Sequence, residues 1–338
     1  MRKPPTPTAT ATAPRADSSD RIPRHVWTLS SVVVLGSIMS ILDTTIVNVG
    51  LDTMSRDLHS SIAEIQWIVT GYMLSLAAVI PVSGWAARRF GAKQVWILSV
   101  ALFTTGSVMC GFSDSTTELI LFRVVQGVGG GMILPIGQLM MAQAAGPKRM
   151  GRVMAIVAVP MMLAPVCGPT IGGLILQNLH WSWIFFVNAP IGVIAVILGI
   201  RLLPHTERAR TDQLDFVGLA LMVTGMPLFV YGLAQVGTTG SFTAASVIWP
   251  SAAGLALVVA FVLWALRAKL PLLQLRLYSR ATYSTASISM FCLGAGLFGS
   301  AILLPLYWQS IRHFSVIDTG LLTGPQGLGM AMVMPIVG

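Results

Sequence analysis

Ten runs of predominantly apolar residues, each about as long as a membrane-spanning helix, constrain this chain more than any other feature of its sequence. A helix of about 20 residues crosses the roughly 30 Å hydrocarbon core of a bilayer and satisfies its own backbone hydrogen bonds there. Charged residues make up 10% of the chain, whereas soluble domains carry about 25%. The sequence therefore predicts an all-α, polytopic helix bundle embedded in a lipid bilayer.

The apolar runs alternate with short polar connections. We expect the spans at roughly 27–50, 65–85, 93–112, 118–141, 152–177, 183–203, 215–236, 246–266, 283–308 and 319–338. Residues 1–25 have a different composition, rich in Pro, Thr and Ala, and cannot bury a core, so we predict a disordered tail. The tail is not a secretory signal, because the first apolar run begins too far from the terminus.

The positive charges predict the orientation of the bundle. If the N-terminus is cytoplasmic, 18 of the 21 Lys and Arg residues lie in the tail and in the loops on the same side. Only Arg56 and Arg312 then face the other side, and Arg123 lies within a span. Cytoplasmic loops of membrane proteins are enriched in Lys and Arg. The net charge of +9 is therefore interpreted as topology in the cell membrane, and no nucleic-acid partner is expected.

Two charged residues stand inside apolar spans. Asp43 lies in "SILDTTIVN", and Arg123 lies in "RVVQGVGGG". A charge in a membrane span costs several kcal/mol unless it is paired or hydrated, so both side chains should face the bundle interior. Burial favours the protonated form of a carboxyl group and a nearby cation favours the ionised form, which makes Asp43 a candidate proton-binding residue. The alternative is a purely structural carboxylate.

Other polar residues near these two are weaker candidates. Gln126, one turn from Arg123, could hold the guanidinium, and Asn48 is expected to make a helix–helix hydrogen bond rather than a substrate contact. Trp67, Tyr72 and Gln138 could line a cavity, although aromatic residues near the end of a span usually belong to the interfacial belt.

Glycine-rich motifs mark the loops and the close helix contacts. A short basic turn between the second and third spans contains Gly84, Arg88, Arg89, Gly91 and Lys93. Small residues that allow helices to approach closely occur in the fourth and fifth spans, at Gly127, Gly168, Pro169, Gly172 and Gly173. The three cysteines have no disulfide or metal spacing, and no phosphate-binding loop follows a strand. We therefore expect no enzyme activity, no metal and no cofactor.

Together the motifs resemble the major facilitator superfamily, in particular its fourteen-span drug:proton antiporter group of the EmrB/QacA type. "LDTTIVNVGL" resembles the first-helix signature of that group, "RVVQGVGGG" the fourth-helix motif and "GPTIGG" the antiporter motif of helix five; "WSWIFFVNAPIG", "LDFVGLAL" and "LPLYWQ" resemble features of the group. The resemblance implies that the helices carrying Asp43 and Arg123 are neighbours. Deprotonated Asp43 would pair with Arg123, and protonation would release the pair.

The resemblance also implies a domain order. We expect a six-helix bundle at 26–203, two inserted helices at 204–268 and an incomplete second bundle at 269–338, which makes about ten spans of an expected fourteen. The basic loop departs from the superfamily pattern, because Arg88 stands where an aspartate belongs and Ala92 replaces a basic residue. Gating through that aspartate is therefore in question. The first-helix signature also departs, ending Gly50-Leu51-Asp52 instead of A-L-P.

The function implied by the resemblance is proton-coupled export of small lipophilic or cationic compounds by alternating access, as in multidrug efflux. Its partners would be the transported small molecule, protons and the lipid bilayer, and a monomer is favoured. Two alternatives stay open: a dedicated metabolite exporter, and a truncated membrane protein that does not transport.

Overall fold

Nine long helices dominate the computed structural model, which describes residues 22–205, 214–269 and 271–312 and the single residues 314, 322 and 329. The long helices are α1 (Arg24–Asp57), α3 (Trp67–Phe90), α4 (Ala92–Gly111), α5 (Thr116–Ala145), α6 (Pro147–Asn178), α8 (Asn188–Leu202), α9 (Phe216–Thr239), α10 (Ala245–Arg267) and α11 (Ala281–Leu306). Shorter helical segments are α2 (Ile62–Ile65), α7 (Trp183–Phe186), a 3₁₀ helix (Leu275–Ser279) and a π-helical turn (Tyr307–Ile311). The predicted all-α fold is confirmed.

Within the part of the chain that the structure describes, eight helical segments are long and apolar enough to cross a membrane, and α11 is a ninth long helix. Nine of the ten predicted spans fall on these helices. The tenth, predicted at 319–338, lies outside the described residues except for Leu322 and Gly329, and so does most of the predicted tail. The chain is therefore a multi-pass membrane protein.

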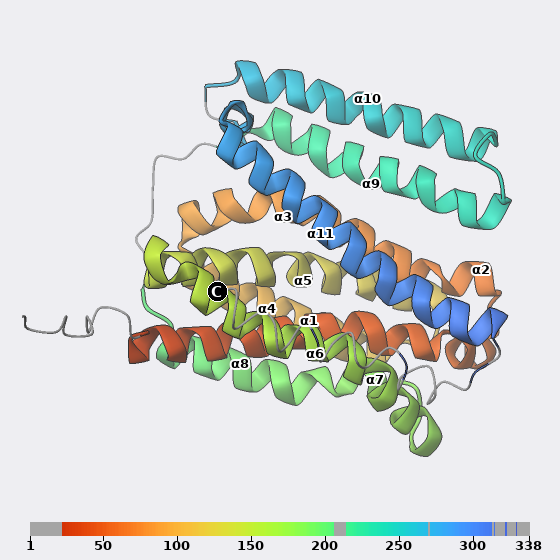
Figure 1. Ribbon diagram of the computed structural model, residues 1–338. Coiled ribbons are helices and arrows are strands. Elements are labelled where there is room, and N and C mark those ends of the chain that lie inside the picture. The colour runs from red at the N-terminus through yellow and green to blue at the C-terminus, as the bar shows by residue number, and fades with distance from the viewer. Residues whose placement is uncertain are drawn as a thin grey trace, which may run out of the picture.

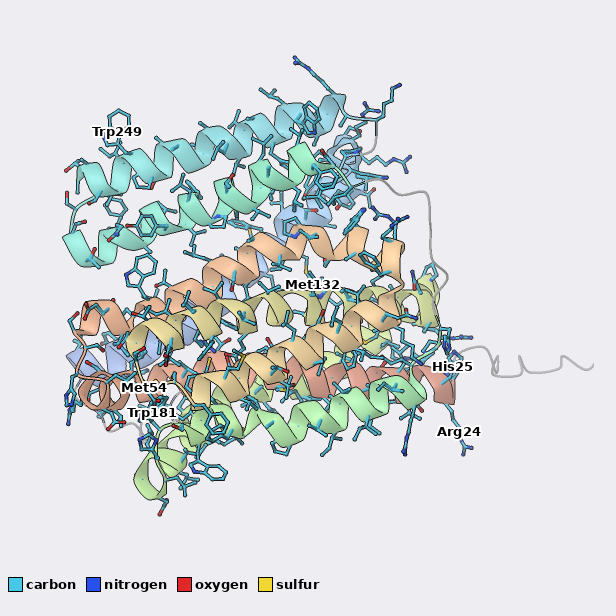
Figure 2. All side chains as sticks on the ribbon, turned by 180° about the vertical axis from the view of Figure 1, so that it is seen from behind. Arg24, His25, Met54, Met132, Trp181 and Trp249 are labelled. Atoms are coloured by element: carbon cyan, nitrogen blue, oxygen red, sulfur yellow. The ribbon has the colours of Figure 1, made fainter. Side chains whose placement is uncertain are left out.

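Successive long helices run in opposite directions along one axis (Figure 1). Figure 2 shows Arg24 and His25 at one end of the bundle, and Met54 and Trp181 at the opposite end. Because the helices alternate, the basic last turns of α3, α8 and α10 lie at the same end as Arg24.

Helix α1 extends past its predicted end near residue 50 and continues to Asp57. The additional turns are polar, so the apolar run ends before the helix does. Asp52 and Arg56 form an i,i+4 ion pair at 2.5 Å on these turns, a spacing that supports helix formation. The end of α1 is also anchored, since Asp57 accepts hydrogen bonds from the Trp181 indole at 2.5 Å and from His180 at 3.0 Å.

The sixth predicted span, 183–203, is interrupted. The structure divides it into α7 and α8, with Val187 between them. Pro190 lies in the first turn of α8, where a missing backbone N–H is tolerated and the fixed φ favours a helix start. This interruption places Asn188 at the beginning of a new helix.

Helices α4 and α5 cross closely at a glycine. A Cβ atom on Gly129 would lie 2.5 Å from the backbone N of Phe103 and 2.6 Å from the carbonyl O of Ser99. Backbone atoms cannot move aside as a flexible side chain can. Any larger residue at position 129 would therefore push α4 and α5 apart.

We accordingly expect Gly129→Ala to lower the free energy of unfolding by about 1–3 kcal/mol, measured by thermal unfolding in detergent. Gly173→Ala is the matched control, because a Cβ atom at Gly173 would have no neighbour within 4 Å. Its unfolding temperature should equal or slightly exceed that of the wild type, since Ala is the better helix former. Equal unfolding temperatures for the two variants would contradict the crossing.

Helices α9 and α10 form a hairpin that packs against α3 through α9. Asp215 joins both ends of this hairpin at one point. Its carboxylate accepts hydrogen bonds from Gly218 N at 2.8 Å, from the Trp264 indole at 2.9 Å and from Leu272 N at 3.1 Å. These contacts cap the start of α9 and hold the segment that follows α10.

Candidate functional site

Asp43 lies in the middle of α1, between two apolar clusters. One cluster surrounds the first half of α1 and includes Trp96 and Phe103, and the other surrounds its second half and includes Ile184. Among the side chains that the structure describes, Asp43 is the only fully buried carboxylate. A buried charge is expensive unless it is paired and hydrogen-bonded, so its contacts indicate what the site is built to hold.

Helix α5 supplies the partner charge. The Nη1 atom of Arg123 lies 2.5 Å from Oδ2 of Asp43, and the two side chains are 1% and 0% exposed. Gln126 completes a triangle: its Oε1 accepts a hydrogen bond from Arg123 Nη1 at 2.8 Å, and its Nε2 donates to Asp43 Oδ1 at 2.9 Å. The three residues that the sequence singled out here are therefore in direct contact, and their role in proton coupling stays a prediction.

Helices α8 and α4 add two residues that sequence analysis missed. The Nδ2 atom of Asn188 donates to Asp43 Oδ1 at 3.0 Å and to Ser107 Oγ at 3.0 Å. Ser107 in turn donates to the carbonyl of Phe185 at 2.9 Å. All of these residues are buried, and Phe185 belongs to the apolar cluster around the second half of α1.

Helix α3 holds the other side of the guanidinium. Arg123 Nε donates to the carbonyl of Ile68 at 3.1 Å, and the guanidinium carbon lies 4.0 Å from the centre of the Tyr72 ring. The Tyr72 hydroxyl is within hydrogen-bond distance of Ser40 Oγ, at 3.2 Å. Tyr72, a candidate for a cavity wall or the interfacial belt, is fully buried beneath Arg123 and supports the cation through its π-face.

The cluster suits an ionised carboxylate. An ionised carboxylate only accepts hydrogen bonds, and Asp43 receives donors from Arg123, Gln126 and Asn188. Charge-assisted hydrogen bonds of this kind are stronger than neutral ones. A proton on Asp43 would cancel the attraction to Arg123 and oppose the donors, so the cluster can exist in two states that differ by one proton.

Three of the predicted site residues lie elsewhere. Asn48 is exposed on α1. At about 100° per residue, the five-residue step from Asp43 turns the helix by about 500°, which places Asn48 about 140° around the helix from Asp43. Gln138 is exposed on α5. Trp67 is half-buried and packs against Tyr231 of α9, with ring centres 5.4 Å apart. A cavity wall formed by Trp67, Tyr72 and Gln138 stays a prediction.

The basic loop forms a tight turn between α3 and α4. Gly91 is the only residue between the two helices and has a φ of 92°, which favours glycine. Lys93 is buried and donates from Nζ to the carbonyls of Ile200 and Leu203 at 2.8 and 2.7 Å. A cation at a helix C-terminus is stabilising, so Lys93 caps the end of α8.

The remaining loop residues surround this turn. Gly84 lies within the last turns of α3, Arg88 is exposed and Arg89 is half-buried. Both arginines make interactions of their own. The role of these residues in gating stays a prediction.

Three glycines of the predicted packing motifs lie at close helix contacts. Gly127 faces Ser75 and the carbonyl of Tyr72 on α3. Gly168 faces Thr45, and Gly172 faces Ile46, both on α1. Pro169 is one of three prolines inside α6, whereas Gly173 faces open space.

The residues described here include no group of three His, Cys, Asp or Glu side chains that could hold a metal ion. The candidate functional site is therefore the buried polar cluster around Asp43.

Two relatives resemble the chain over nearly all of its length. The "Multidrug resistance protein B homolog" of Mycobacterium tuberculosis (strain CDC 1551 / Oshkosh) is 41% identical over 99% of this chain and 63% of the relative. The "Multidrug export protein EmrB" of Haemophilus influenzae is 32% identical over 92% of this chain and 61% of the relative. The chain thus spans about three fifths of the length of these curated relatives.

Solved structures share the fold at low sequence identity. The proton:xylose symporter XylE, bound to 6-bromo-6-deoxy-D-glucose, superposes with a TM-score of 0.62 at 12% identity, over 92% of this chain and 68% of that protein. A sequence model described as "Major Facilitator Superfamily", a family of transporters rather than enzymes, matches residues 33–338. The chain belongs to the Major Facilitator Superfamily.

Proposed function

We propose that this chain acts in the cell membrane as a proton-coupled exporter of small lipophilic or cationic compounds, working by alternating access. The observation that carries the proposal is the fully buried pair of Asp43 and Arg123, at 2.5 Å within a membrane-spanning bundle. Intramembrane ionisable residues are costly and mostly functional. The names of the two relatives, a multidrug resistance protein homolog and a multidrug export protein, support the substrate class.

The proposed cycle uses the two states of the Asp43 cluster. In the deprotonated state, Asp43 holds α5 through Arg123 and Gln126. Protonation weakens that link and shifts the bundle toward the state open to the other side. A cationic substrate favours release of the proton by electrostatic competition, which couples substrate export to proton entry.

Orientation and domain division belong to the same proposal. Basic residues gather at the end of the bundle that carries Arg24, which supports a cytoplasmic N-terminus. The division into a six-helix bundle at 26–203, an inserted pair at 204–268 and the start of a second bundle at 269–338 stays a prediction. The packing of α9 and α10 as one hairpin is consistent with an inserted pair.

The direct test is transport in vesicles that contain the purified full chain. A pH gradient is imposed, and uptake of a lipophilic cationic dye is followed against vesicles without protein. We expect the gradient to drive dye transport and a protonophore to abolish it.

A panel of chemically varied compounds in the same vesicles separates the two exporter classes. Transport of several unrelated cations or lipophilic compounds supports multidrug export, whereas transport of a single metabolite indicates a dedicated exporter. Transport that does not depend on the pH gradient, or the absence of transport for every compound, would contradict proton-coupled export.

A further inference from the structure

We propose that Asn188 is a positioning residue for proton coupling: it holds the Asp43 carboxylate ionised and connects that carboxylate mechanically to the α4–α8 pair. The inference rests on the proposed function, because it assigns a regulator to the same proton-binding residue. Asn188 is 145 residues from Asp43 in the chain, yet the two side chains are joined by a buried hydrogen bond of 3.0 Å.

The surrounding hydrogen bonds leave only one orientation for the Asn188 amide. Ser107 has a single hydroxyl proton, which it donates to the carbonyl of Phe185. Ser107 Oγ can therefore only accept from Asn188, so the NH₂ group of the amide must face Ser107. The second N–H of the same group is then directed to Asp43 Oδ1. Asn188 is fixed as a donor.

Gln126 is fixed as a donor in the same way. The Arg123 guanidinium has no acceptor, so Gln126 must present its Oε1 to Arg123. The Cys110 thiol, 3.7 Å away, approaches the same oxygen. The Nε2 group is left for Asp43 Oδ1. Two N–H groups from two helices therefore converge on one carboxylate oxygen.

A proton on Oδ1 cannot coexist with both of these hydrogen bonds. The oxygen would become a hydroxyl group, and its hydrogen would lie close to the donor hydrogens of Asn188 and Gln126, which already point at that oxygen. Neither amide can reverse without breaking its other bonds, so a proton on Oδ1 separates Asp43 from Asn188, from Gln126 or from both. A proton on Oδ2 instead opposes Arg123 and removes the charge of the carboxylate, which weakens the hydrogen bonds that Oδ1 accepts. The bond to Asn188 is thus sensitive to the protonation of Asp43.

Asn188 transmits this change to two helices at once. The buried residues of α8 are Asn188, Gly192, Ala195 and Gly199. Gly192 faces Thr104, and a Cβ atom on Gly199 would lie 2.9 Å from the Trp96 ring, so α8 packs tightly on α4. Ser107 of α4 holds the same amide. When Asp43 releases Asn188, α1 loses a buried hydrogen-bonded link to α8 and, through Ser107, to α4.

The test compares pH profiles of gradient-driven efflux in vesicles containing the full chain. Asn188→Leu keeps a similar volume but removes the donor. Because hydrogen bonds to a carboxylate favour its ionised form, the variant retains its proton to higher pH. We expect the acidic half-maximum of the profile to move upward by about one pH unit, the shift expected for one charge-assisted hydrogen bond.

Two further variants make the result independent of folding defects. Asn188→Asp keeps the shape of the side chain and places a second acidic group beside Asp43, so it should move the same half-maximum further upward. Thr104→Val is the control on the same α4–α8 contact: its hydroxyl bonds within its own helix, to Val100 O at 2.7 Å. It should leave the profile in place, even if it changes the maximal rate.

The outcomes separate this inference from the proposed function. If Asp43→Asn abolishes coupled efflux while the Asn188 variants change only the maximal rate, the positioning role is wrong and the proposed function stands. If Asp43→Asn transports normally, both fail together. A profile that shifts in the Asn188 variants and not in Thr104→Val supports the positioning role.

Discussion

Asp43→Asn is expected to reduce pH-gradient-driven efflux to the level of vesicles without protein. The substituted amide keeps the size and planar shape of the carboxylate, and its oxygen can still accept from Arg123. It cannot bind or release a proton in the accessible pH range, so the two states of the cluster no longer alternate with pH. Movement of substrate down its own gradient should persist, since that movement requires no proton exchange.

Asp52→Asn is the matched control for this substitution. Asp52 lies nine residues further along α1, is exposed and pairs with Arg56 at 2.5 Å. Exposed ion pairs contribute only about 0–1 kcal/mol, so this variant should fold and transport as the wild type does. Undiminished gradient-driven efflux by Asp43→Asn, or equal losses in both variants, would rule out Asp43 as the coupling residue.

Arg123→Met is expected to cause the largest loss of stability, about 3–5 kcal/mol at neutral pH. It removes the only cation that contacts Asp43 among the described residues and leaves a buried carboxylate without its charge partner. Thermal unfolding in detergent measures the effect. The loss should shrink at acidic pH, because protonation removes the unpaired charge.

The double variant Asp43→Asn/Arg123→Met tests the physical cause of that loss. If the unpaired carboxylate is responsible, neutralising it should recover much of the lost stability at neutral pH. The interaction free energy from the four proteins of this double-mutant cycle reports the coupling directly. Additive losses would mean that the pair contributes packing alone.

The spans could be predicted from the sequence because a helix needs about 20 predominantly apolar residues to cross the hydrocarbon core of a bilayer. The apolar run predicted an end of α1 near residue 50, which is too early, since the helix continues through Asp52 and Arg56 to Asp57. Asp43 and Arg123 could be predicted as partners because a charge inside a span requires one and because the family resemblance implies that their helices are neighbours.

Residues contributed by tertiary packing had no such local signal. Asn188 follows a cluster of aromatic residues, a pattern typical of the membrane interface, and only the fold brings it to Asp43. The contact of Tyr72 with Arg123 likewise had no local signal, since it depends on the α3–α5 packing. Asn48 shares a motif with Asp43, but helical periodicity separates the two side chains.

Because α1 is long and Asp43 lies near its middle, a small tilt of the helix at Asp43 becomes a larger displacement at both helix ends. The helix has 34 residues without an internal proline, so Asp43 lies about 28 Å from one end and about 21 Å from the other. If α1 pivots there as a rigid rod, a tilt of about 10° displaces its ends by roughly 5 and 4 Å in opposite directions. Such a tilt moves the two ends of α1 in opposite directions, so α1 approaches a neighbouring helix at one face of the membrane as it moves away at the other.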